Sequence, residues 1–123
     1  MMADHVSHQV GSEVLFENDR VRVWRLTLQP GEASPHHRHE HDYLFVNVTS
    51  ASVELRQAGE EPSTEHFAAG YVEYSEVGSG IEHHIVNKGP GVLEEILIEL
   101  KGPSRAAAPR DPQTNGRSRP VGE

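Results

Sequence analysis

Short runs rich in β-branched and aromatic residues recur about every ten positions, and turn-forming residues separate them. Two of the turns are strong signals, Gln29-Pro30-Gly31 and Lys88-Gly89-Pro90-Gly91. This rhythm is typical of an all-β sandwich or barrel. The pattern predicts strands at Val21–Leu28, Tyr43–Val48, Val53–Arg56, Tyr71–Tyr74, Ile81–Asn87 and Val92–Leu100, with a polar loop at Gly59–Thr64.

The segment Val92–Leu100 (VLEEILIEL) also fits a helix of about two turns. Its isoleucine and valine content and the turn before it favour a strand. As a strand it would be apolar on both faces, with Ile96, Ile98 and Leu100 on one face, and Leu93 and Leu97 on the other. Such a strand needs a partner on each side, so the sequence predicts a homodimer.

The two ends of the chain differ from its middle. The chain has 123 residues, of which 35% are apolar, and this suits one domain with a small core. We assign residues 13–101 to that domain and residues 1–12 to a flexible N-terminal segment or a short added strand. Residues 102–123 contain four prolines, four arginines and little apolar material, which predicts a disordered tail.

Composition excludes several functions. The net charge of −8 argues against a nucleic-acid partner. The absence of cysteine excludes disulfides, zinc–thiolate sites and thiol nucleophiles. The sequence contains no signal peptide and no segment that could span a membrane, so we expect a cytoplasmic protein without a membrane partner. It also contains no phosphate-binding loop and no Gly-x-Ser-x-Gly motif.

Histidine carries the candidate chemistry. Four of the nine histidines lie within His36–His41, and two more, His83 and His84, follow a Gly-x-Gly segment. On a strand, His-x-His places two rings on one face, and imidazole is a common ligand of borderline metals. Because two distant segments can close around one ion, the sequence indicates a metal-binding domain.

These residues resemble a known family. Gly31, five residues and then His37-x-His39 are similar to the first cupin motif, and Gly80-x-x-His83-x-x-x-Asn87 is similar to the end of the second. The resemblance covers Glu13–Leu100, and it is to small single-domain bacterial cupins with an HRH-x-HDY first motif. It implies a double-stranded β-helix, or jelly roll, with one divalent metal ion held by His37, His39 and His83. Iron is the favoured metal, and zinc, nickel, manganese and copper are alternatives.

The first motif departs from the family at Tyr43, where cupins usually have a glutamate ligand. Strand parity places His37, His39, His41 and Tyr43 on one face. The chain therefore resembles the three-histidine subset of cupins. This resemblance makes Tyr43 either a barrel-wall residue or a catalytic hydrogen-bond donor to a metal-bound ligand. Three neutral imidazoles leave the charge of the ion uncompensated, so the site should favour an anionic, chelating small molecule.

Other side chains near the motifs are weaker candidates. Three alternate residues on a strand span about 13 Å, too far for His41 to join His37 on one ion, so we expect His41 to line the barrel mouth or to bond a neighbour. His36 and His84 have the opposite parity and should face outward, although His84 becomes a ligand if the phase of its strand shifts. A carboxylate ligand could come from Glu40, Asp42 or Glu82 if the turn geometry differs. Asn87 is expected to be a structural turn residue and Trp24 a core residue.

The resemblance leads to one leading function and two alternatives. We expect a metal-binding cupin that is an iron-dependent dioxygenase acting on a small anionic or dicarbonyl compound. A protein of another class, a non-catalytic cupin that binds a metal or small molecule as a sensor, would share the same residues. A non-redox cupin of the isomerase type is the third reading, and the sequence identifies no acid–base pair for it.

Overall fold

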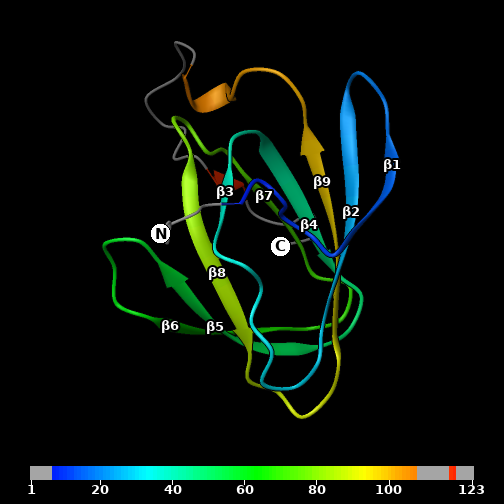
Figure 1. Ribbon diagram of the computed structural model, residues 1–123, viewed down its shortest axis with the longest axis vertical. Helices are drawn as coiled ribbons and strands as arrows, with labels where there is room; N and C mark the ends of the chain where they lie inside the picture. The colour runs from blue at the N-terminus through cyan, green and yellow to red at the C-terminus, as the bar shows by residue number, and fades with distance from the viewer. Residues whose placement is uncertain (1–6, 108–116, 119–123) are drawn as a thin grey trace, which may run out of the picture.

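The computed structural model of the chain describes residues 7–107 and 117–118, and over these residues it is a β-structure of two antiparallel sheets (Figure 1). The larger sheet has the strand order β1-β2-β9-β4-β7-β10, and the smaller has the order β3-β8-β5-β6. The strands are β1 (Glu13–Glu17), β2 (Val21–Leu28), β3 (His37–His39), β4 (Asp42–Asn47), β5 (Ala51–Gln57), β6 (Ser63–Phe67), β7 (Val72–Ser75), β8 (Ile81–Asn87), β9 (Leu93–Leu100) and β10 (Arg117–Ser118). A short 3₁₀ helix, η1 (Arg105–Ala107), follows β9. This arrangement confirms the predicted double-stranded β-helix.

Alternating burial explains why the central strands form. In β2, burial alternates so that Trp24, Leu26 and Leu28 enter the interior and their neighbours do not. In β9, which pairs with β2 along its whole length, burial alternates in the same way from Leu93 to Leu100. The strand interpretation of this segment is therefore confirmed. Trp24 is a core residue as predicted, and its indole N–H donates to the buried carboxylate of Glu99 at 2.7 Å.

Three strands were not predicted, namely β1, β6 and the two-residue β10, and all three lie at sheet edges. β1 borders the larger sheet, and every one of its residues is exposed. β6 borders the smaller sheet and begins inside the predicted loop Gly59–Thr64, with four of its five residues exposed. An edge strand that buries neither face needs no apolar alternation, so hydrophobic periodicity gives no signal for it.

Both ends of the described chain pack against the barrel. Ser7 forms a parallel bridge with His37, and Val10 is 2% exposed and belongs to the core. Ser104 is buried, and its hydroxyl donates to the buried carboxylate of Asp42. The backbone N–H of Arg105 donates to the same carboxylate at 2.6 Å. The sequence assigned these positions to the flexible segment and the disordered tail. Residues 1–6, 108–116 and 119–123 of these two expected segments lie outside the described residues.

Two glycines of the motifs lie near the site and have positive φ angles, which glycine adopts without strain. The N–H of Gly31, which has a φ of 83°, donates to the carbonyl of Asn87 at 2.8 Å and so joins the first motif to the end of the second. Gly80 has a φ of 130°, and a Cβ there would collide with the guanidinium of Arg38. Asn87 is structural, as predicted, because its amide donates to the carbonyls of Leu28 and of the hairpin loop.

Within the described part of the chain, no helix has the length and apolar character needed to cross a membrane.

Candidate metal centre

Cross-strand pairing brings the two histidine segments together. β3 and β8 are antiparallel neighbours, and His37 lies directly opposite His83 in their register. His39 lies two residues farther along β3 and therefore shares its face with His37. Arg38 lies between them on the other face, where it bonds the carbonyl of Ser79 and pairs with Glu82 at 3.2 Å. The cross-strand pair of His37 and His83, together with the two-residue step from His37 to His39, therefore defines the cluster.

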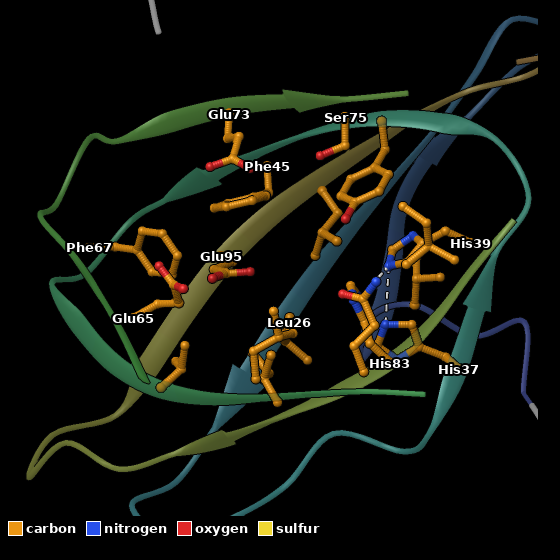
Figure 2. Close-up of a pocket in the computed structure, with 18 of the residues that line it drawn as sticks. Leu26, His37, His39, Phe45, Glu65, Phe67, Glu73, Ser75, His83 and Glu95 are labelled. Carbon is orange, nitrogen blue, oxygen red and sulfur yellow. Dashed lines mark hydrogen bonds between the residues drawn. The ribbon is translucent and has the colours of Figure 1, made fainter. Parts of the chain in front are cut away.

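The three imidazoles converge on one point inside the barrel (Figure 2). The Nε2 atom of His39 lies 3.1 Å from that of His37 and 2.9 Å from that of His83. One ring nitrogen from each residue lies within 4.8 Å of the other two. Two nitrogens bound to one ion at about 2.1 Å can be separated by at most about 4 Å, so the two short separations suit a shared ion.

The hydrogen bonds of the rings favour a cation at this point. His37 donates its Nδ1 proton to the carbonyl of Pro35 at 2.8 Å, which leaves a lone pair on its Nε2. His39 Nδ1 is buried and has no hydrogen-bond partner among the described residues. If His39 carries its proton on Nδ1, the lone pair on its Nε2 faces the lone pair on the Nε2 of His37. A cation between the two atoms would relieve the repulsion between these lone pairs. The donor set thus fits a divalent ion.

Burial keeps the three imidazoles neutral. His39 is 1% exposed and His37 is 4% exposed. Burial lowers the pKa of His37 to about 4 and that of His83 to about 3, and it holds the pKa of His39 well below 6.5. A neutral imidazole is the form that binds a metal, so no proton has to leave these rings at neutral pH.

Tyr43 lies beside the histidines on the cavity wall. Its ring stacks on that of His39, with 4.0 Å between the ring centroids and 10° between the planes. The parity argument placed His41 on the same face, and this is wrong. The chain leaves β3 after His39 and enters β4 at Asp42, so the period-two alternation does not continue across the break. His41 does not line the cavity, and its Nδ1 lies 3.1 Å from the carbonyl of Gly102.

The remaining candidates lie outside the cavity. His36 and His84 contact each other through their Nδ1 atoms at 3.3 Å, on the other face of the smaller sheet from the cluster. The Asp42 carboxylate accepts bonds from Ser104 and from the backbone of residues 77 and 105. Neither of the other two carboxylates lines the cavity: Glu40 lies 3.5 Å from Arg38, and Glu82 also pairs with Arg38. None of the three therefore completes the cluster.

The histidines form part of the wall of a cavity of about 380 Å³ inside the barrel. This volume is at the lower end of the range for small-molecule sites. Most of the wall is apolar, and it also includes four glutamates that were not candidates from the sequence: Glu65, Glu73, Glu76 and Glu95.

Two of these carboxyl groups are deeply buried. Glu95 is 5% exposed and Glu73 is 4% exposed. Burial, together with the negative charge of Glu73, raises the pKa of Glu95 to about 7, and a hydrogen bond from Asn47 opposes this rise. Glu73 accepts a hydrogen bond from the hydroxyl of Tyr71 at 2.6 Å. A sequence signal for Glu95 existed, because in β9 it has the same parity as Leu93 and Leu97.

A double-stranded β-helix with converging histidines inside the barrel defines the cupin class of proteins. No family model matches the sequence. The solved cupin domain from Bordetella pertussis Tohama I is similar over 81% of this chain and 100% of that chain, with 25% identity and a TM-score of 0.67. A double-stranded β-helix protein from Klebsiella pneumoniae superposes over 76% of each chain, with 21% identity and a TM-score of 0.58.

One curated relative is also similar in sequence. The beta-alanine degradation protein BauB of Pseudomonas aeruginosa is 27% identical over 88 residues, which are 72% of this chain and 90% of that protein. With the fold, the Bordetella structure and the three-histidine cluster, this places the chain among the small bacterial cupins.

Proposed function

We propose that this cupin is a metal-dependent dioxygenase for a small anionic or dicarbonyl compound, with iron as its metal. The observation that carries the proposal is the ligand set: two buried imidazoles and one half-buried imidazole, all neutral, with no carboxylate among the described groups that converge. A divalent ion held there would keep its positive charge and would supply binding positions for an anionic, chelating substrate and for O₂. Both oxygen atoms of O₂ would end in the product.

The surrounding residues have defined tasks in this proposal. His37, His39 and His83 would hold the ion, and the Pro35 carbonyl fixes the ring of His37 in the orientation that presents Nε2. Tyr43 orients the ring of His39 by stacking, and its hydroxyl would donate to a bound anion. The apolar wall, which includes Leu26, Val53, Ile81 and Leu97, excludes water from the reacting groups.

The relative from Pseudomonas aeruginosa is named for the degradation of beta-alanine, which is itself a small carboxylate. That name and the volume of the cavity both support a small-molecule substrate. A compound that chelates an ion through a carboxylate or two carbonyl oxygens satisfies both conditions.

The test compares His39→Ala with a matched control, His36→Ala. His36 is the neighbouring histidine outside the cavity, so its removal controls for the loss of an imidazole from the same segment. Protein made without an affinity tag is analysed for metals. We expect about one ion per chain in the parent and in His36→Ala, and nearly none in His39→Ala. Stoichiometric metal in His39→Ala would contradict the ligand assignment.

The second arm of the test concerns turnover. The iron-loaded parent is given small carboxylates and diketones, and O₂ uptake is followed with an oxygen electrode. Uptake that depends on both iron and substrate supports the dioxygenase. Firm binding of zinc with no uptake under any of these conditions would instead identify a non-catalytic binding protein.

A further inference from the structure

The cavity has two chemically different ends. Figure 2 shows the three histidines at one side and Glu73, Glu95, Phe45 and Phe67 at the other. The strand register agrees with this view: Tyr43, which stacks on His39, lies four residues before Asn47 on β4, and Asn47 is the ladder partner of Glu95. Four residues of a strand span about 13 Å, so the two ends lie well apart along the barrel.

The second end contains more hydrogen-bond acceptors than donors. Glu95 and Glu73 are both buried and both line the cavity. Asn47 is 0% exposed, and its amide bonds the Glu95 carboxyl group. The Oδ1 atom of Asn47 is buried and has no hydrogen-bond partner among the described residues. No lysine or arginine is among the described residues that line the cavity.

This surplus has an energetic cost that a cation would remove. Burying a carboxylate without a positive partner is unfavourable, and burial accordingly raises the pKa of Glu95 to about 7. A ligand that brings N–H donors and a positive charge would satisfy the Glu95 carboxylate, which lines the cavity.

Aromatic rings complete this end of the cavity. Phe45, Phe67 and Tyr71 contact one another, with ring centroids 5.2 to 6.0 Å apart. Phe45 and Phe67 line the cavity itself. Aromatic faces attract cations, and they do so more strongly where water is excluded. Two buried carboxyl groups and two aromatic rings therefore line the same end of the cavity.

We propose that Glu95, Glu73 and the rings of Phe45 and Phe67 form a subsite for a protonated amine. If the function proposed above holds, the substrate carries an anionic or dicarbonyl group at the histidines and an ammonium group at Glu95, joined by a chain long enough to span the two ends of the cavity. The competing interpretation is that Glu95 and Glu73 are a structural carboxyl pair that shares a proton and binds no ligand.

The test uses probes that cannot chelate a metal. Propylammonium and 1-propanol are matched in length and differ in charge, and their binding to the protein as purified is measured by titration calorimetry at about pH 8, where Glu95 is mostly ionised. We expect propylammonium to bind roughly ten- to a hundredfold more tightly than 1-propanol, as for one charge-assisted hydrogen bond. Equal affinity for the two probes overturns the subsite in favour of the structural pair, and this comparison needs no variant.

Two variants locate the binding. Glu95→Gln keeps the shape of the side chain and removes its charge, and it should lower the affinity for propylammonium by about tenfold or more. Glu94→Gln is the control, because Glu94 is the adjacent residue on the opposite face of β9. If Glu95→Gln is too unstable to study, Glu73→Gln should show a loss in the same direction. Unchanged propylammonium affinity in the folded variants would overturn the assignment to these carboxylates.

A third variant separates this inference from the proposed function. His39→Ala should bind propylammonium as the parent does, because the amine subsite does not use the metal. If His39→Ala retains its metal, or the iron-loaded parent consumes no O₂, the proposed function fails while the amine subsite stands. If propylammonium binding is absent while metal is bound and O₂ is consumed, only the subsite fails.

Discussion

Replacing Glu95 by glutamine should change how the stability of the protein depends on pH. Burial raises the pKa of this carboxyl group from 4.5 to about 7 in the folded chain, with the charge of Glu73 as a further cause. The folded state therefore holds this proton more tightly than the unfolded state does. Between these two pKa values the unfolded state binds fewer protons, so the contribution of Glu95 to stability is present below pH 4.5 and is lost as pH rises through about 7.

The size of this effect follows from the two pKa values. The gap between 4.5 and about 7 corresponds to about 3 kcal/mol of folding free energy when fully expressed. Part of this contribution to stability is already lost at about pH 5. Between about pH 5 and about pH 8 the parent should therefore lose about 2 to 3 kcal/mol of unfolding free energy relative to Glu95→Gln. The lowered pKa values of the three histidines act in the opposite direction, and they cancel because both proteins contain these residues.

The measurement is urea unfolding of the parent and Glu95→Gln, both without metal, at about pH 5, 6, 7 and 8. The difference between the two unfolding free energies should change steadily in favour of the variant as pH rises. Glu94→Gln controls for the loss of one formal charge from β9. A difference that stays constant over the whole range would refute the reasoning, because Glu95 would then have the same proton affinity in the folded and unfolded chains.

Three further predictions concern other parts of the molecule. Tyr43→Phe keeps the ring that stacks on His39, so metal content should remain that of the parent while affinity for azide falls roughly ten- to a hundredfold; loss of the metal would make the phenol a ligand. Truncation after Lys101 removes the hydrogen bonds that Ser104 and Arg105 give to buried Asp42, and urea unfolding should show a loss of at least about 2 kcal/mol, whereas truncation after Ala107 should cost less. We propose that the outer face of β9 packs on a second copy of the chain, since Val23, Ile98 and Leu44 are lateral neighbours there; Ile98→Glu should then convert a dimer to a monomer in light scattering, and a monomeric parent would rule this out.

The histidine cluster could be predicted from one local rule and one family resemblance. His-x-His on a strand fixes the relative direction of His37 and His39, and the resemblance to the cupin motifs supplies His83 from the neighbouring strand. The same parity rule failed for His41, because it holds only while the chain remains in one strand. The break between β3 and β4 is not marked by proline or glycine, so hydrophobic and polar periodicity could not locate it.

Long-range hydrogen bonds account for the packing of the chain ends. Arg105 and Asp42 are 63 positions apart, and their contact depends on a buried carboxylate that accepts two backbone N–H groups and one hydroxyl. Composition gives no sign of such a partner, since proline- and arginine-rich segments bury little apolar surface of their own. A segment can therefore have the composition of a disordered tail and still pack where one buried acceptor fixes its backbone.

The acidic end of the cavity shows what sequence reasoning about β9 left out. The sequence divided the apolar residues of VLEEILIEL between two strand faces and assigned no place to its glutamates. The structure keeps that division and adds Glu95 and Glu99 to the interior face of Leu93 and Leu97, while Ile96 and Ile98 lie on the outer face. A buried acidic residue is costly unless something offsets its charge. For Glu99 that partner is visible, since the indole of Trp24 donates to it and Arg22 lies 3.6 Å away. Glu95 has the amide of Asn47 and no lysine or arginine along the described cavity wall. The two glutamates of one strand face are thus stabilised differently, and it is the one without a protein cation that faces the space where a ligand would bind.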